Sequence, residues 1–204
     1  MPVYAESLDK GVLVDMSKAI SKALGKELNL QVVPFSRSLD NAINGTVAFH
    51  APLIQNPNIA ESTLKYKHST ETIFHVNFVL YTKAGSGITK STLKGKNIET
   101  DAAHVAYFPF PIVASTSLEG SLQKLSAGRI DGFIFADAAT DPLVSKLALT
   151  NIKRELYHRF DVKIILPKNA AGDATDKELT KAIGILKKSG EWNKIMSILD
   201  APYK

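Results

Sequence analysis

The chain has 204 residues, 45% of them hydrophobic and 22% charged, with a formal net charge of +5. This is the usage of a folded globular protein, and it argues against long disordered spans and low-complexity segments. The basic residues are dispersed, so the charge does not predict a nucleic-acid surface. No apolar stretch is long enough to cross a bilayer, and the absence of cysteine excludes disulfides, thiolate catalysis and cysteine zinc sites.

The first quarter of the chain predicts two helices and two short strands. Apolar residues at three- and four-residue steps predict a helix over residues 12–24, which Gly25 terminates. Residues 28–34 then predict a strand. A brief helix with Ser36 as its candidate N-cap follows, and residues 47–53 predict a second strand.

The next segments combine a polar stretch with one clear strand. Residues 56–72 are polar and predict a loop. Residues 74–83 are rich in aromatic and β-branched side chains and predict a strand. A glycine-containing break at 84–89 separates it from a short strand near 97–100.

The remainder of the chain alternates strands and helices. Helices are predicted after Ser117, over residues 138–148 and 192–199, and from a capping box of Thr175 and Glu178; strands are predicted over 130–136 and 161–167. This alternation predicts an α/β protein with mainly parallel sheets. The element order predicts that residues 1–83 and 159–204 form one discontinuous lobe, into which residues 84–158 are inserted as a second lobe.

Five short segments spread over nearly the whole chain have a characteristic order. The first is P-V-Y followed by G-V-L-V-D-M-S-K-A-I-S-K-A-L-G, and the second is P-F-S-R-S-L-D-N-A-I-N-G. The third is S-T-L-K-G-K-N, and the fourth is L-Q-K-L-S-A-G-R-I-D-G-F-I-F-A-D. The last is D-K-E-L-T-K-A-I-G-I-L-K-K-S-G-E-W-N-K-I. Their order and spacing resemble the family 3 bacterial extracellular solute-binding proteins, which have the type II periplasmic-binding fold.

The resemblance implies a two-lobed α/β clamp that acts in an ABC-type solute uptake system. Such a protein holds a small polar or anionic molecule in the cleft between its lobes and presents it to a membrane permease. It also implies a periplasmic location, no cofactor and no catalysis. Two alternatives share the scaffold, namely a ligand-sensing module for signalling and a dehydratase-like enzyme.

On the first lobe, the expected ligand contacts are Tyr4, Arg37, His50 and Ala51. The resemblance assigns Tyr4 to an aromatic wall, although a residue so near a terminus can also be frayed. Arg37 offers a planar five-donor group to a carboxylate or phosphate, and its alternative is an exposed arginine in a helix's first turn. His50 and Ala51 lie at the end of a predicted strand that faces the expected cleft.

On the second lobe, the expected contacts are His104, Phe108 and Asp137. His104 follows a short strand, at the place that corresponds to His50. Phe108 belongs to the run Y-F-P-F-P, which is either a lobe-packing loop or part of the cleft wall. Asp137 follows a buried strand and begins a helix, so capping and ligand contact are both open and compatible.

Catalytic and metal sites are not predicted. The five histidines lack metal-ligand spacing, and the sequence has no P-loop, nucleophile elbow or dinucleotide-binding motif. We therefore expect no catalytic residue, no metal and no cofactor.

Two departures from the family pattern bear on the ligand and on the fold. Amino-acid binders of the family often carry an arginine in the segment that corresponds to residues 58–69, and this chain has none there. Either Arg37 binds the anion or the ligand is not a standard amino acid. The family's apolar strand before the P-V-Y segment is also missing, so we expect Met1 to be an internal methionine of a longer precursor. A monomer is expected, with an oligomer as the alternative if another subunit fills the gap.

Overall fold

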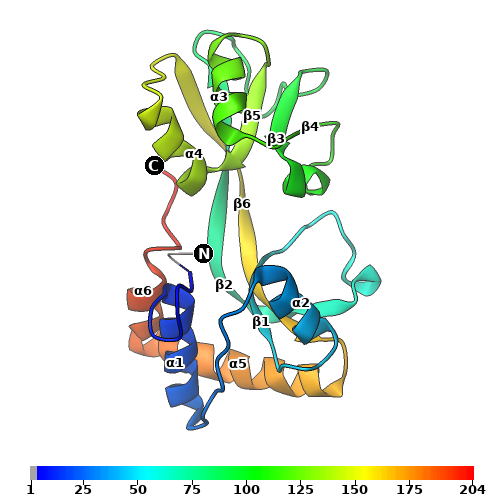
Figure 1. The fold of residues 1–204 in the computed structure, drawn as a ribbon, viewed down its shortest axis with the longest axis vertical. Helices are drawn as coiled ribbons and strands as arrows, with labels where there is room; N and C mark the ends of the chain where they lie inside the picture. The colour runs from blue at the N-terminus through cyan, green and yellow to red at the C-terminus, as the bar shows by residue number, and fades with distance from the viewer. Residues whose placement is uncertain (1–3) are drawn as a thin grey trace. The chain divides into compact units, whose positions relative to one another are not determined.

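A computed structural model describes residues 4–204 and divides them into two compact units. Unit 1 comprises residues 4–55, 59–75 and 161–201, and unit 2 comprises 56–58, 76–160 and 202–204. The strands β2 (Tyr66–Lys83) and β6 (Ile152–Pro167) carry the chain from unit 1 to unit 2 and back (Figure 1). The predicted lobe boundaries, 1–83 with 159–204 and 84–158, stay a prediction. No helix among residues 4–204 has the length and hydrophobicity to cross a membrane.

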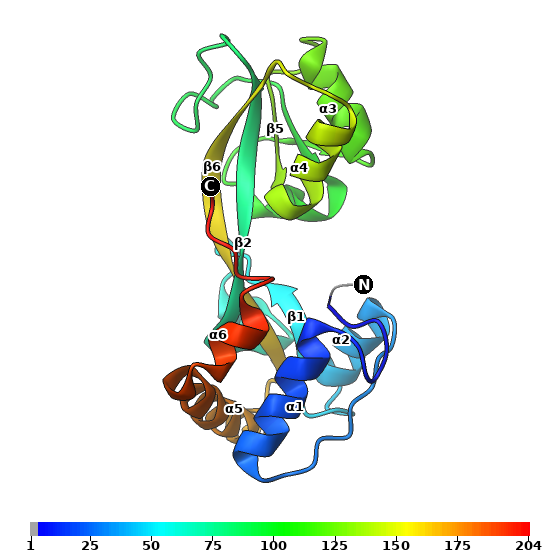
Figure 2. The same ribbon diagram turned by 90° about the vertical axis from the view of Figure 1, so that its left-hand side faces the viewer.

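Unit 1 packs helices against β1 and the adjoining parts of β6 and β2. Its other elements are α1 (Val12–Leu24), α2 (Phe35–Ile43), β1 (His50–Ile54), a 3-10 turn (Glu61–Thr63), α5 (Ala170–Ser189) and α6 (Glu191–Met196). Helix α1 ends at Gly25, which adopts a left-handed φ of 63°. Its side chains Met16 and Ile20 are fully buried, and α1 packs against α5 and α6 (Figure 2).

Unit 2 is a smaller α/β layer built on β2. Its elements are β3 (Ile98–Asp101), a 3-10 helix (Ala102–Tyr107), β4 (Val113–Ser115), α3 (Leu118–Ser126), β5 (Gly132–Ala136) and α4 (Asp137–Lys146). Strand β5 pairs antiparallel with β2 and parallel with β3, and β3 pairs parallel with β4. One cluster of its core contains the buried side chains of Val79, Tyr81, Leu122, Leu125, Ile130 and Phe133. A Cβ atom at Gly132 would come within 2.9 Å of Ile98 Cδ1, so glycine at this position leaves room for the Ile98 side chain.

The α/β class is confirmed, but the prediction of mainly parallel sheets is wrong. The sheet is mixed, because β1 runs antiparallel to β6 and β2 runs antiparallel to β5. The predicted helix over 12–24 is confirmed, as is the helix after Ser117, whose side chain accepts a hydrogen bond from Gly120 N (3.0 Å). These elements were predictable because local caps and glycine stops define their ends.

Two segment predictions are wrong for reasons of long-range pairing. Residues 28–34 form no strand, because no strand within residues 4–204 pairs with them. The loop predicted over 56–72 instead contains the beginning of β2, which starts at Tyr66. Its polar residues are compatible with a strand because they bond to α5, which is distant in sequence.

Two predicted helix caps are also wrong. Helix α2 begins at Phe35 after Pro34, so Ser36 lies inside its first turn. Helix α5 begins at Ala170, and Asn169 caps it by accepting a hydrogen bond from Gly172 N (3.0 Å). Thr175 therefore lies inside α5, where its hydroxyl donates to Ala171 O (3.0 Å).

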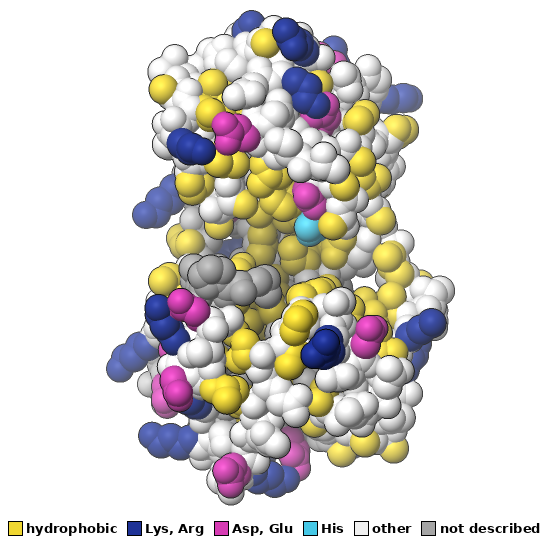
Figure 3. Space-filling model, viewed as in Figure 1, with side chains coloured by type: hydrophobic (Ala, Val, Ile, Leu, Met, Phe, Trp, Pro, Cys, Tyr) yellow, Lys and Arg dark blue, Asp and Glu magenta, His cyan; other side chains and the backbone are white. Residues whose placement is uncertain are grey.

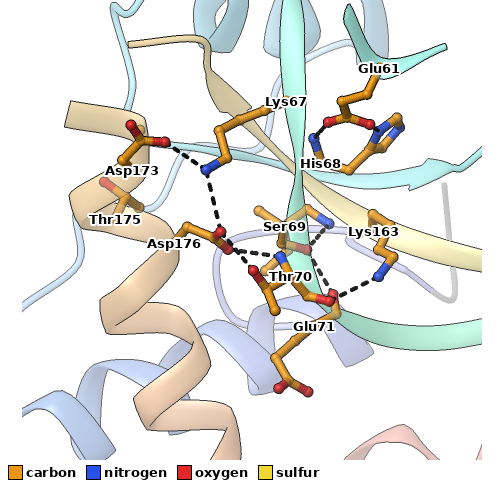
Figure 4. A network of polar contacts seen from close by, with 12 residues as sticks. Glu61, Lys67, His68, Ser69, Thr70, Glu71, Lys163, Asp173, Thr175 and Asp176 are labelled. Atoms are coloured by element: carbon orange, nitrogen blue, oxygen red, sulfur yellow. Dashed lines mark hydrogen bonds and ion pairs between the residues drawn. The ribbon is translucent and has the colours of Figure 1, made fainter. Parts of the chain in front are cut away.

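A polar network attaches the beginning of β2 to α5 (Figure 4). Asp176 is only 8% exposed, and its carboxylate accepts hydrogen bonds from Thr70 N (2.8 Å) and Thr70 Oγ1 (2.9 Å). Lys67 Nζ lies 3.4 Å from Asp176 and 2.7 Å from Asp173. Lys163 Nζ donates to Thr70 O (3.0 Å), which ties β6 to the same point.

A buried histidine ties α2 to β1. His50 begins β1, is only 3% exposed, and its Nδ1 lies 2.8 Å from the hydroxyl oxygen of Ser38 on α2. The ring of Phe35 meets the His50 ring edge-on at 4.9 Å. Burial lowers the pKa of His50 to about 4, so this histidine is neutral at pH 7.

The network predicts that Asp176→Ala destabilises the fold while Asp173→Ala does not. Loss of two hydrogen bonds to a buried carboxylate lowers the free energy of unfolding by about 2–3 kcal/mol. Asp173 contacts the same lysine, but its side chain is 62% exposed, so its removal leaves the unfolding midpoint nearly unchanged. Urea denaturation of both variants measures the difference, and equal losses would contradict the assigned role of Asp176.

The second prediction concerns His50 and pH. Its pKa in the folded state lies below the ordinary value of 6.5, so protonation favours the unfolded chain. Between pH 7 and pH 4 the wild type therefore loses up to about 3 kcal/mol of stability through this group, with no such loss above pH 7. His50→Asn removes this contribution, whereas the exposed His158→Asn keeps it. Denaturation curves across that range test this, and an unchanged pH slope in His50→Asn would contradict it.

Candidate functional site

In unit 1, the structure brings His50 and Ala51 together on the wall of a cavity of about 370 Å³. The cavity lies wholly within this unit, between residues 27–33 and 46–51. Since His50 is buried and neutral, it contributes no positive charge toward a ligand at pH 7. The only strong anion-binding group among the unit 1 candidates is therefore Arg37.

Arg37 lies in the first turn of α2, between the two residues that contact His50. Phe35 and Ser38 hold this turn against β1, so the backbone at Arg37 is fixed. The Arg37 side chain is exposed, and it forms no ion pair or hydrogen bond with any residue of 4–204. A fixed backbone with an unused guanidinium fits recognition of a carboxylate or phosphate.

Tyr4 is placed by contacts within unit 1. Its carbonyl accepts a hydrogen bond from Leu13 N (2.9 Å) at the beginning of α1, and its ring lies 5.9 Å from the ring of the buried Phe74. Burial raises the pKa of the Tyr4 phenol, so the group is neutral at pH 7. Neither of these contacts involves Arg37 or His50, and the assignment of Tyr4 to an aromatic ligand wall stays a prediction.

In unit 2, an aspartate orients His104. The Asp101 carboxylate accepts a hydrogen bond from Ala103 N (3.0 Å) and lies 2.8 Å from His104 Nδ1. Because an ionised carboxylate is only an acceptor, Nδ1 carries the proton. In the neutral ring, Nε2 is then an acceptor. The sequence interpretation placed His104 correctly after β3 but did not identify Asp101 as its partner.

An aromatic cluster surrounds His104. Its ring lies 5.2–5.5 Å from the rings of Phe78, Tyr107 and Phe135. Phe108 is 7% exposed and packs against Phe78, Phe110 and Tyr157, all within unit 2. Within the Y-F-P-F-P run, Phe108 therefore packs against residues of unit 2, to which the run itself belongs. A ligand-facing role for Phe108 stays a prediction.

Asp137 begins α4 directly after β5. One of its carboxylate oxygens accepts a hydrogen bond from Ala138 N (2.7 Å), and the other accepts one from Asn77 Nδ2 (3.0 Å). The carboxylate remains partly exposed. Asp137 can bind the backbone N–H at the beginning of α4 and also contact a ligand, and contact with a ligand stays a prediction.

Two consecutive residues of β2 connect all three unit 2 candidates. Asn77 bonds to Asp137, and Phe78 contacts His104 and Phe108. Sequence reasoning missed both residues. Asn77 was detectable in principle, because a polar side chain inside the apolar run F-H-V-N-F-V-L-Y is expected to have a buried partner.

The distribution of charged side chains and of possible metal ligands indicates which interactions could hold a ligand. On the face drawn in Figure 3, lysine and arginine side chains are scattered among acidic ones and form no continuous basic patch. Within residues 4–204, no group of three or more His, Asp or Glu side chains is arranged to hold a metal ion. The arrangement therefore favours hydrogen bonding, ring stacking and a single ion pair as the means of holding a ligand.

Comparison with solved structures identifies the fold. A histidine kinase sensor domain with similarity to periplasmic binding proteins is 16% identical, with a TM-score of 0.66 over 96% of this chain and 90% of that one. The arginine-, lysine-, histidine-binding protein ArtJ of Geobacillus stearothermophilus is 19% identical, with a TM-score of 0.61 over 100% and 92%. The substrate-binding protein of an amino acid ABC transporter is 20% identical, with a TM-score of 0.57 over 92% and 86%.

Sequence comparison adds no closer relative. No protein-family model matches the chain, and no curated protein matches it. The solved structures match nearly the whole length of this chain, at sequence identities that establish the fold alone. This chain has the two-lobed α/β fold of the type II periplasmic-binding proteins.

Proposed function

We propose that the protein is the substrate-binding component of an ABC-type solute uptake system. In this proposal, units 1 and 2 are the two lobes, and they close over one small polar or anionic molecule. The protein then presents that molecule to a membrane permease from the periplasmic side. Binding, with no chemical conversion of the ligand, is the proposed activity.

The observation that carries this proposal is the fold similarity over almost the entire chain. ArtJ binds arginine, lysine and histidine, and another of the similar structures is the substrate-binding protein of an amino acid ABC transporter. The two units share β2 and β6, so each has its own core while two strands connect them. A protein with this connectivity can bind by a relative movement of two rigid bodies.

The candidate residues of the two units would contact different chemical groups of one ligand. Arg37 supplies the positive charge for an anionic group. His104 supplies an oriented acceptor for a hydroxyl or N–H group, and the rings of Tyr107 and Phe135 supply a flat apolar surface. The proposed ligand is therefore a small molecule with an anionic end and at least one hydrogen-bond donor.

One observation favours sensing as the second candidate function. The histidine kinase sensor domain has the same fold with a TM-score of 0.66. The binding step is the same in both functions, and only the partner differs. Pull-down from detergent-solubilised membranes distinguishes them, because uptake requires a transporter permease and sensing requires a kinase.

A thermal-shift screen over amino acids, organic acids and amines tests ligand binding itself. A compound that binds only the folded state raises Tm, by an amount that grows with its concentration. The proposal predicts at least one compound with a saturable shift and no turnover during prolonged incubation. Conversion of that compound into a product would support the dehydratase-like alternative, with His104 or Asp137 as the acid or base to replace.

We predict that Arg37→Gln weakens binding of the compound found in that screen. Loss of a charge-assisted hydrogen-bonding group reduces affinity about 10–100-fold. Tm of the free protein stays unchanged, since Arg37 has no partner among the described residues. Calorimetric titration measures the affinity. The control is Arg129→Gln, at the opposite end of β5 from Asp137, and equal affinity losses in both variants would contradict the assignment.

His104→Phe tests the acceptor role in unit 2. Phenylalanine preserves the ring contacts with Phe78 and Phe135 but removes Nε2, so affinity falls about 10-fold while the free protein keeps its Tm within a few degrees. His158→Phe is the matched control, because that histidine also contacts an aromatic ring, that of Phe160, but is exposed. Unchanged affinity in His104→Phe would remove His104 from the site.

A further inference from the structure

Three of the places where the chain crosses between the units meet at one histidine. The chain leaves unit 1 along β2 after His75, returns along β6 at Asp161, and leaves again after Ala201. His75 Nδ1 lies 3.0 Å from Asp200 Oδ1, and His75 Nε2 lies 3.3 Å from Asp161 Oδ1. One imidazole in unit 1 therefore contacts all three segments at the points where they reach the boundary of that unit.

The third of these segments is anchored at both of its ends. In unit 1, Asp200 Oδ1 accepts a hydrogen bond from His75 N (3.2 Å) in addition to its contact with Nδ1 of the same residue. In unit 2, Arg154 NH1 donates to Lys204 O (3.3 Å), and the Arg154 guanidinium lies 5.2 Å from the centre of the Tyr203 ring. The segment from Asp200 to Lys204 is therefore held by specific contacts in each unit.

The two carboxylates determine which protonation state of His75 can hold both of them. An ionised carboxylate only accepts hydrogen bonds, and a neutral imidazole has one N–H and one acceptor nitrogen. Only the imidazolium, with an N–H on each nitrogen, donates to Asp161 and Asp200 at once. In the neutral ring Nδ1 keeps the proton, because Asp200 is closer and is also held beside Nδ1 by the His75 backbone N–H. Nε2 is then an acceptor that faces the carboxylate of Asp161.

The other charged residues on these segments belong to types that do not titrate near neutral pH. On β2, side-chain alternation places Glu71 on the same side of the strand as His75, and Glu71 forms an ion pair with α5. On β6, Arg159 and Lys163 alternate onto the side that contacts the ring, and the segment after α6 carries no further charge before Lys204. Among the residue types in this cluster, only histidine ordinarily changes charge between about pH 5 and pH 8.

We propose that His75 is a proton-dependent clamp on the segments that leave unit 1. The ring holds Asp200, and with it the segment after α6, in both of its protonation states. It holds Asp161, and with it β6, only as the imidazolium. Deprotonation therefore releases β6 from the clamp, and the local freedom of β6 at Asp161 increases as the pH rises through the range in which histidine titrates.

NMR of the full chain without ligand tests the clamp, so its outcome does not depend on the proposed function. The proposal predicts an N–H on both ring nitrogens of His75 at about pH 6 and on Nδ1 alone at about pH 8.5. The amide of Gln55 donates to Asp161 O (2.8 Å), so its hydrogen exchange reports on β6 at this point. Its protection, corrected for the intrinsic effect of pH, is predicted to fall about 10-fold over the same range. A single N–H on the His75 ring at pH 6 would overturn the proposal.

Two variants separate the clamp from a general effect of pH on exchange. His75→Gln and Asp161→Asn are each predicted to abolish the pH response of the Gln55 amide, because neither retains the pair of an imidazolium and a carboxylate. His158→Gln is the matched control, since it removes an exposed histidine of β6 and keeps the response. A wild-type response in either of the first two variants would overturn the proposal. If one of them does not fold, the other variant and the protonation of the wild-type ring decide the outcome.

Discussion

Two strands are shared by both units, and this sharing constrains the whole architecture. Strand β2 has 18 residues and β6 has 16, and each contributes to two separate cores. One end of β2 carries polar residues that bond to α5, and the other carries Val79, Leu80 and Tyr81 into the core of unit 2. Each unit is built around part of both strands, so neither unit is formed by one continuous segment of the chain.

The same strands determine where the candidate ligand groups lie. Asn77 and Phe78 follow directly after the point at which β2 enters unit 2, and they contact Asp137, His104 and Phe108. In unit 1, β1 pairs with β6 and carries His50, which fixes the first turn of α2 and therefore the backbone of Arg37. The candidate residues of unit 2 are thus in direct contact with a shared strand, and His50 and Arg37 of unit 1 are attached to one through β1.

Local signals predicted part of this structure. Gly25 and Ser117 correctly marked helix ends, because a left-handed glycine and a side-chain cap act within a few residues. The polar half of β2 was not predictable in this way. Its partner Asp176 lies 106 residues from Thr70, and no local pattern reports such a contact.

In the candidate site, too, some residues were predictable from the sequence and others were not. Positions at strand ends indicated His50, His104 and Asp137. The structure places His104 after β3 and Asp137 directly after β5, but His50 begins β1 instead of lying at the end of a strand over 47–53. Asp101 was missed because its importance lies in its 2.8 Å contact with His104. The strand predicted over 28–34 failed for the opposite reason, since β-rich composition forms a strand only where a neighbour supplies hydrogen bonds.

The central claim is that ligand binding moves two rigid units that are joined by β2 and β6. The chain has no cysteine, so Lys22→Cys in unit 1 and Lys94→Cys in unit 2 introduce the only two labelling sites. Energy transfer between dyes at these sites, measured during titration with the compound found by thermal shift, reports their distance. The account predicts a change that saturates with the same Kd as the binding measured by calorimetry. Saturable binding with unchanged energy transfer would contradict it.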